Sequence, residues 1–312
     1  MSEIVRAQRK KSYGKQFAKF KREIPLHIML IPSIVIVFIY HYLPMFGIIM
    51  AFQRFNPILS FWSSPFIGLK NFVDILSMKD FWRAFNNSFI IAFLKIICGL
   101  SVPLLMALLI NEIRWNKFKR TVQTSIFLPY FLSWTVLGGV VQQIFALDGP
   151  INTIIRNTGG EEIMFLASNS WFRFILVFTD VWKGMGYNII IFLAAITSID
   201  PALYEAAQID GGNRLRQSWH ITLPGMRPII ILVATLAIGG LLNAGFEQIF
   251  ILYSPSVYQS ADILDTLVYR LGLINSRLAP AAAVGLFKSA LSLVLVGIAY
   301  YSAYKFSDYR IF

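Results

Sequence analysis

The residues best suited to making a specific contact form a short polar island, 200–225, between two long apolar stretches. Asp200 can accept hydrogen bonds from the free N–H groups of a helix start, and Pro201 suits the first helical position. Gly211 and Gly212 permit a left-handed stop. The island therefore predicts a short capped helix that begins after Asp200 and ends before Gly211.

One face of this predicted helix carries mainly small apolar side chains, with Glu205 beside it. The residues at helical positions i, i+3, i+4 and i+7 share this face, and they are Leu203, Ala206, Ala207 and Asp210. Small side chains allow another surface to approach closely, and a carboxylate can pair with a basic or hydrogen-bonding group. We expect this helix to dock on another protein. An ordinary amphipathic connecting helix is the alternative interpretation.

Polar side chains inside the apolar stretches form a second candidate site. Such groups are expensive in lipid, so they face a cavity or pair with one another. A structural ion pair between Asp180 and Lys183 is one alternative, and Lys95 is assigned no role beyond snorkelling or binding a neighbouring helix. The candidates for a substrate pathway are Asp180, Trp182, Lys183, Tyr187, Asn188, Asn243, Glu247, Gln248 and Lys288.

Several kinds of reactive centre are missing from the sequence. It has no G-x-x-x-x-G-K-[ST] phosphate loop, no H-E-x-x-H zinc motif and no G-x-S-x-G nucleophile elbow. Its three histidines are scattered, and the single cysteine, Cys98, lies within an apolar stretch. We therefore expect no catalytic residue, no metal site and no cofactor in this chain.

The elements that carry these residues are predicted to be membrane-spanning helices. Of the 312 residues, 56% are hydrophobic and 14% are charged, whereas soluble domains carry about a quarter charged residues. About 20 apolar residues are needed to cross the hydrocarbon core as a helix. The sequence predicts an all-α polytopic membrane protein with six spans, near 28–50, 84–110, 122–146, 172–197, 228–251 and 283–305.

The net charge of +12 is explained by membrane topology and not by nucleic-acid binding. With the N-terminus inside, the inner segments hold 17 Lys or Arg and the outer segments hold eight. An excess of Lys and Arg marks the cytoplasmic side. Both termini and the island are therefore predicted to be cytoplasmic, with the basic tail near anionic membrane lipid.

The island also resembles a known motif. Glu205-Ala206-Ala207, then Gly211, then Ile221-x-Leu223-Pro224 resembles the EAA loop of bacterial ABC importer permeases. The whole chain is similar to the maltose-type carbohydrate permeases, and more narrowly to the LplB/YteP-like branch associated with complex oligosaccharide uptake. The resemblance implies the type I ABC importer permease (MetI-like) fold.

That resemblance also implies a division of the chain. Residues 1–27 would be the basic tail, and residues 28–83 the first span with its outer loop. Residues 84–305 would be a permease core of five spans, with the cytoplasmic coupling loop at 198–227. Residues 306–312 would be the cytoplasmic C-terminus.

The implied function is import of oligosaccharides or polysaccharide fragments across the cell membrane by alternating access. A pair of separate ATPase chains would bind ATP and Mg, and the EAA helix would sit in a groove of one of them. A second, homologous permease and an extracellular solute-binding protein would complete a heteromeric complex. The implied coupling residues are Leu203, Glu205, Ala206, Ala207, Asp210, Gly211, Leu223 and Pro224.

Other functions remain open at this level. A permease of the same superfamily for amino acids, phosphate or lipid-linked peptides is the nearest alternative. An ion-coupled secondary carrier would use Asp180, Lys183 and Glu247 to relay charge, but it has no need of an ATPase dock. A membrane-embedded enzyme of lipid or glycan metabolism is disfavoured by the missing catalytic motifs.

Overall fold

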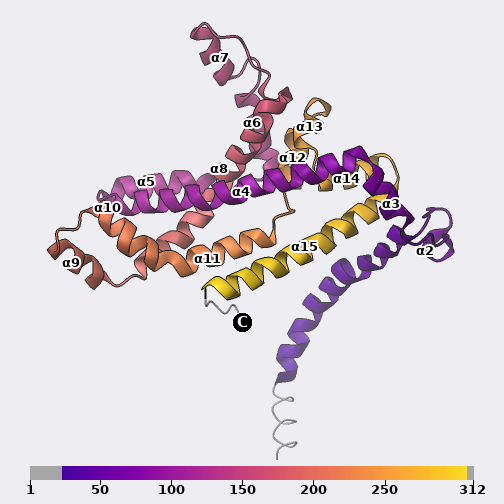
Figure 1. The fold of residues 1–312 in the computed structure, drawn as a ribbon, viewed down its shortest axis with the longest axis horizontal. Coiled ribbons are helices and arrows are strands. Elements are labelled where there is room, and N and C mark those ends of the chain that lie inside the picture. The colour runs from indigo at the N-terminus through magenta and orange to yellow at the C-terminus, as the bar shows by residue number, and fades with distance from the viewer. Residues whose placement is uncertain (1–22, 308–312) are drawn as a thin grey trace, which may run out of the picture.

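A computed structural model describes residues 23–307. Within this range the chain forms helices and no β-strand, and one isolated bridge pairs Gln53 with Phe66 (Figure 1). The all-α prediction is confirmed. The predicted basic tail (1–27) and C-terminus (306–312) lie outside the described residues, except for 23–27 and 306–307.

Five helices of the described chain are long and apolar enough to cross a membrane. A sixth span is formed if one sharply bent pair of helices is counted as a single crossing. The five long helices are Glu23–Phe52, Lys79–Glu112 (α4), Asn169–Thr197 (α8), Arg214–Gly239 and Leu278–Tyr301, the last lying within α15 (Leu278–Ser307).

Shorter elements connect or extend these helices. The first long helix ends in η1 (Phe38–Tyr42) and η2 (Leu43–Phe52), and Arg214–Gly239 comprises α10 (Arg214–Gln217), η5 (Ser218–Thr222) and α11 (Leu223–Gly239). The other short helices are α2 (Ser60–Ser63), α3 (Lys70–Ser77), α7 (Pro150–Asn157), η4 (Phe165–Ala167), α9 (Pro201–Ile209), η6 (Pro255–Val257), α13 (Tyr258–Ala261), α14 (Leu264–Tyr269) and η7 (Arg270–Ile274).

The predicted third span, 122–146, is wrong as a single straight helix. The chain forms α5 (Asn116–Phe127) and η3 (Leu128–Phe131), then α6 (Trp134–Ile144) at an angle of 108° to them. Pro129 within η3 has no N–H to continue a helical ladder. Ser133 is extended and its side chain accepts a hydrogen bond from the Val136 N–H, which starts α6 as a new helix.

The predicted fifth span, 228–251, is also wrong at its outer end. α11 ends at Gly239, and a non-helical break of residues 240–245 separates it from α12 (Phe246–Leu252). Gly245 has a φ of +89°, a conformation that glycine adopts without strain and other residues avoid. The glycines in this stretch end the helix, although the sequence around them is apolar.

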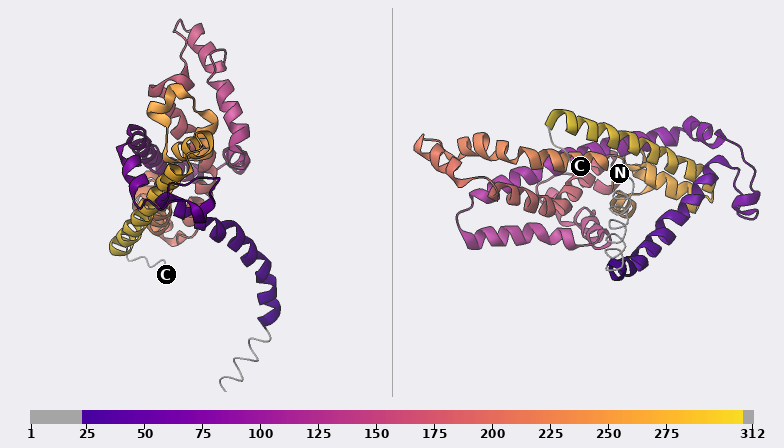
Figure 2. Two further views of the ribbon diagram at one scale, coloured as in Figure 1. Left: turned by 90° about the vertical axis from the view of Figure 1, so that its right-hand side faces the viewer. Right: turned by 90° about the horizontal axis from the view of Figure 1, so that it is seen from below.

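The long helices define one axis of the molecule. α4 and α8 pack along each other, and α11 and α15 lie beside them (Figure 1). α9 and α10 lie at one end of this axis, and α2 and α3 lie at the other. The N-terminal helix slants away from the body, and α6 and α7 project sideways from it (Figures 1 and 2). The predicted coupling segment and the predicted first outer loop are therefore at opposite ends.

α4 is the helix on which the core is assembled. Its buried residues contribute to all three apolar clusters of the described chain. Ile91 packs with α8 and α12, Phe81 packs with α3, α14 and α15, and Ile110 packs with α8 and α11. Fully burying a side chain of this size contributes about 1.5–3 kcal/mol, so α4 holds the other helices in position.

A buried ion network fixes one end of the bundle. Asp262 is fully buried, and it accepts two hydrogen bonds from the Arg270 guanidinium at 2.9 and 2.6 Å and one from the Thr266 hydroxyl. The Asn87 amide donates to the Asp262 carbonyl, and Arg173 donates to the Asn87 side-chain oxygen at 2.7 Å. The network therefore joins α4, α8 and the segment that contains α14.

Candidate functional site

The helix α9 forms as its sequence predicts. The Asp200 side chain accepts a hydrogen bond from the Ala202 N–H at 2.9 Å, and Pro201 occupies the first turn. Gly211 ends the helix with a φ of +78°, and the Gly212 N–H donates to the Ala207 carbonyl at 2.7 Å. A Cβ at position 212 would lie 2.7 Å from that carbonyl oxygen, so this turn has no room for a side chain.

The outward face of α9 is uncovered in this chain. No residue of the helix is buried, and the apolar side chains of Leu203 and Ile209 are 53% and 87% exposed. Glu205 is exposed, and no hydrogen bond or ion pair joins it to the described part of the chain. Exposed apolar residues beside an unpaired carboxylate are typical of a surface that binds another protein.

The inner side of α9 is tied to the long helices. The Tyr204 hydroxyl lies 3.0 Å from the Thr222 hydroxyl, and Arg214 forms a 2.7 Å ion pair with Glu112 at the end of α4. A polar cavity of about 770 Å³ lies between these attachments. Leu223 and Pro224 begin α11 directly after them. Tyr204 therefore joins α9 to the residues that begin α11, and Arg214 of the following helix α10 joins the segment after α9 to α4.

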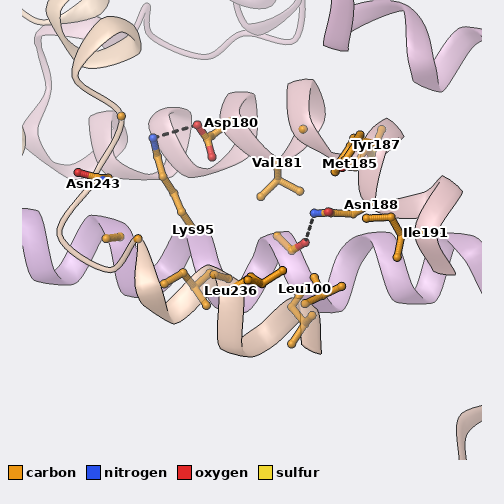
Figure 3. A pocket seen from close by; sticks show the side chains of 18 residues that line it. Lys95, Leu100, Asp180, Val181, Met185, Tyr187, Asn188, Ile191, Leu236 and Asn243 are labelled. Carbon is orange, nitrogen blue, oxygen red and sulfur yellow. Dashed lines mark hydrogen bonds and ion pairs between the residues drawn. The ribbon is translucent and has the colours of Figure 1, made fainter. Parts of the chain in front are cut away.

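A second candidate site is a cavity of about 420 Å³ in the middle of the bundle. It is lined by α4, α8, α11 and the break at 240–245. Four of the predicted pathway residues line it (Figure 3), and they are Asp180, Tyr187, Asn188 and Asn243. Its volume is within the range of small-molecule sites, which is about 300–1,000 Å³.

Asp180 at this cavity pairs with Lys95 and not with Lys183, so the alternative of an Asp180–Lys183 ion pair is wrong. Asp180 accepts a hydrogen bond from the Lys95 ammonium of α4 at 3.0 Å, and no Asp180–Lys183 ion pair exists in the described chain. Lys95 also donates to the Ala244 carbonyl at 2.7 Å and to the Gln248 side-chain oxygen. Both residues line the cavity, and with side chains 8% and 34% exposed for Lys95 and Asp180, the carboxylate is the more open of the two.

Two further lining residues present hydrogen-bonding and aromatic groups. Asn188 lines the cavity, and its amide donates to the Gly99 carbonyl at 3.1 Å (Figure 3). Tyr187 stacks on Tyr130 with ring centroids 5.5 Å apart. Asn243 is exposed and lies in the break, close to Lys95. Such groups match what a hydroxyl-rich solute needs for binding.

The structure does not bring the other predicted pathway residues to this cavity. Lys183 donates to the carbonyls of Tyr130 and Leu132, and Trp182 is half-buried on α8 outside the lining. Gln248 is fully buried, and its amide donates to Leu176 and Thr179, so it supports Lys95 instead of facing solvent. Glu247 is exposed in the first turn of α12.

Lys288 belongs to a separate, largely apolar cavity of about 740 Å³. It forms an ion pair with Asp265 at 2.6 Å, and both residues line this 740 Å³ cavity, which is distinct from the central cavity. Asn243 and Gly245 line both cavities, so the break at 240–245 lies between them. No cluster of three or more potential metal ligands occurs in residues 23–307.

Comparison with known proteins gives the family. Residues 23–308 match the protein family described as "Binding-protein-dependent transport system inner membrane component". The chain belongs to this family. As an inner-membrane transport permease it is expected to have several apolar helices, and the five long helices with one bent pair agree with that.

This permease is similar to two proteins of Bacillus subtilis, one of which is named for polysaccharide transport. The chain is 40% identical over 296 residues to Protein LplB of Bacillus subtilis, covering 95% of this chain and 93% of that protein. It is 39% identical to the polygalacturonan/rhamnogalacturonan transport system permease protein YteP of the same organism, covering 92% and 90%. The predicted resemblance to this branch is confirmed.

Solved structures give the same fold for this permease. A chain of a bacterial ABC transporter involved in the import of the acidic polysaccharide alginate superposes with a TM-score of 0.87 at 35% identity, covering 94% of this chain and 99% of that one. The same kind of transporter in complex with an alginate pentasaccharide-bound periplasmic protein gives a TM-score of 0.83. The type I importer permease fold is therefore confirmed.

The residue of this permease that the sequence analysis missed is Lys95. It lies 85 residues from Asp180 and 153 residues from Gln248 along the chain, so no local spacing predicts these contacts. The one available indication was its position in the middle of an apolar stretch, where a charge requires a partner.

Proposed function

We propose that this chain is the membrane-spanning subunit of an ATP-driven importer of oligosaccharides or polysaccharide fragments. The substrate class is supported by the polygalacturonan/rhamnogalacturonan permease YteP at 39% identity over 92% of the chain, and by the alginate transporter chain at 35%. The chain would perform no covalent chemistry and would move its substrate by alternating access, as the helices swing as rigid bodies.

The coupling site of the proposed importer is the exposed face of α9. Glu205 and Ala206 lie on the uncovered surface, with Leu203 providing an apolar contact, and Gly211 and Gly212 fix the turn behind it. This face would sit in a groove of a cytoplasmic ATPase, which would bind the ATP and Mg. Asp210, Leu223 and Pro224 would complete the contact or link it to α11.

The proposed assembly has more than one permease. One chain supplies one α9 helix, whereas a pair of ATPases offers two equivalent grooves. A second, homologous permease would supply the other helix, and an extracellular solute-binding protein would deliver the sugar. The complex of the alginate transporter with its periplasmic protein supports the binding-protein part of this proposal.

The proposed orientation places α9 in the cytoplasm. The Lys and Arg excess on that side supports it, as does the position of α2 and α3 at the opposite end of the long helices (Figure 1). Both termini would then be cytoplasmic, and the substrate pathway would run through the central cavity past Asp180, Tyr187 and Asn243.

The observation that carries this proposal is an exposed, capped small-residue helix at one end of a bundle whose central cavity has a mainly apolar lining with a few polar groups. The experiment is copurification of the tagged chain from its native membrane, followed by a ligand screen on the binding protein that accompanies it. We expect an ATPase, a second permease and a binding protein that retains an oligosaccharide. A binding protein selective for amino acids or phosphate would contradict the substrate class, and absence of any ATPase would contradict the mechanism.

A further inference from the structure

We propose that two lysines inside the spans, Lys95 and Lys183, are positioning residues that hold the two breaks of the permease in place. One break is residues 240–245 between α11 and α12, and the other is residues 128–133 between α5 and α6. The Lys95 ammonium donates to one backbone carbonyl of its break, and the Lys183 ammonium donates to two of the other. The inference rests on the proposed function, because both breaks border the proposed substrate pathway.

The first break is bound by Lys95. An ammonium has three N–H donors, and here they meet the Asp180 carboxylate, the Ala244 carbonyl and the Gln248 side-chain oxygen. These acceptors belong to α8, the break and α12, while Lys95 itself belongs to α4. One buried side chain therefore connects four parts of the chain.

Gly245 shows how closely the break packs on this ammonium. A Cβ built at position 245 would lie 2.8 Å from the Lys95 Nζ atom, so a larger residue would displace one or the other. The positive φ of Gly245 turns the chain toward α12 at the same point. Figure 3 shows Lys95 extending from α4 to Asp180, with Asn243 on the adjacent break.

The second break is bound by Lys183. Its ammonium donates to the Tyr130 carbonyl at 3.1 Å and to the Leu132 carbonyl at 2.7 Å. It also lies 5.8 Å from the ring centroids of Tyr130 and Trp134, at distances where a cation is attracted to an aromatic face. The contacts reach across the break from η3 to the start of α6.

Lys95 and Lys183 satisfy the same physical requirement, which is a hydrogen-bond donor for backbone carbonyls at a break. A chain break within the hydrocarbon region leaves backbone carbonyls without helical partners, and such breaks persist only where other groups satisfy them. Lys288 provides the contrast. It lies in the unbroken helix α15, and its ammonium donates to the two oxygens of the Asp265 carboxylate instead of to backbone carbonyls.

The consequence for transport is that each lysine would affect sugar passage through the break it holds, although Lys95 itself also lines the central cavity. Asn243 and Gly245 of the first break line the central cavity. Tyr130 of the second break stacks on Tyr187, which lines the same cavity. Holding the two breaks therefore sets the positions of an amide and an aromatic ring at the proposed pathway.

Cysteine accessibility in native membranes tests the proposal without substrate or ATP. The full chain carries Cys98→Ser and one reporter, either Ala244→Cys at the first break or Leu132→Cys at the second. Lys95→Met and Lys183→Met remove each ammonium while keeping the length of the side chain. The rate of labelling by N-ethylmaleimide is measured at both reporters, and each lysine variant serves as the control for the other.

We expect Lys95→Met to raise labelling at position 244 by about tenfold and to leave position 132 unchanged, since a lost charged hydrogen bond shifts an opening equilibrium by about that factor. Lys183→Met should give the reverse pattern. The proposal would be overturned if a lysine variant raised the labelling rate equally at positions 244 and 132, or if it changed the rate at neither position. If Lys95→Met does not accumulate in the membrane, the Lys183→Met variant alone decides. A higher labelling rate at position 132 supports the proposal, and an unchanged rate contradicts it. The labelling rate does not depend on sugar import, so a negative labelling result would contradict the positioning role of the lysines without contradicting the proposed transport function.

Discussion

At the scale of single residues, the polar side chains of the spans divide into two groups. Lys95 and Gln248 are buried, and their polar atoms are engaged by other parts of the protein. Asp180 and Asn243 keep polar atoms at the wall of a cavity. The first group stabilises the architecture, and the second is available to a solute.

A first prediction concerns the cavity wall. Replacing Asn243 by Ala should raise the sugar concentration that half-saturates transport by about tenfold, because one hydrogen bond contributes about 1 kcal/mol or somewhat more. The measurement is uptake by the complete importer against sugar concentration. Thr235→Ala is the control, since Thr235 lies on α11 outside the cavity lining and bonds only within its own helix. Equal half-saturation in both variants and the parent would argue against the pathway.

A second prediction concerns the buried ion network. Asp262→Asn leaves the Arg270 guanidinium, whose side chain is 16% exposed, without its carboxylate, and should destabilise the protein by about 3–5 kcal/mol. Thermal unfolding in detergent measures this. Asp80→Asn breaks an ion pair with Arg83 whose carboxylate is 55% exposed, so that loss should stay below about 1 kcal/mol. Similar melting temperatures for the two variants would contradict the difference we assign to burial.

At the scale of elements, the sequence predicted some features and missed others for physical reasons. α9 was predicted with its cap and stop because Asp200, Pro201 and Gly211 act on their nearest neighbours. The breaks of the third and fifth spans were missed because hydropathy averages over a window that contains them. Pro129 and the glycines of 239–245 were the local indications, but their effect depends on carbonyl partners from distant helices.

A third prediction concerns the turn behind α9. Gly211→Ala places a side chain at a φ of +78°, at a cost of about 1–2 kcal/mol, and should weaken ATPase binding while membrane insertion stays normal. The amount of ATPase recovered with the tagged permease measures the effect. Gly297→Ala is the matched control, because a Cβ there meets open space within α15. Full ATPase recovery with both variants would argue against a coupling role for this turn.

At the scale of the whole molecule, the helical class and the five long apolar helices were predictable from hydropathy along the chain, since each crossing needs its own apolar stretch, whereas the bent pair at 116–144 was not. The contacts between spans were not. Lys95 meets Asp180 and Gln248 across 85 and 153 residues, and a single sequence contains no record of which distant helices pack together. The proposed site could therefore be predicted at α9 but only in part at the cavity.

A fourth prediction concerns orientation. A cysteine at Gln208, which is exposed on α9, should react with a membrane-impermeant maleimide only when the cytoplasmic face is open. A cysteine at Trp62, which is 87% exposed near α2 at the opposite end, should react from outside in intact cells. Cys98 is first replaced by Ser in both. Labelling of position 208 in intact cells would overturn the proposed topology.

The most direct test of the central claim is transport by the purified complex in proteoliposomes. With the sugar-loaded binding protein on the side of α2 and ATP on the side of α9, we expect oligosaccharide to accumulate on the ATP side, and accumulation to stop when ATP is omitted. Accumulation that proceeds without ATP and follows an imposed ion gradient would contradict the account.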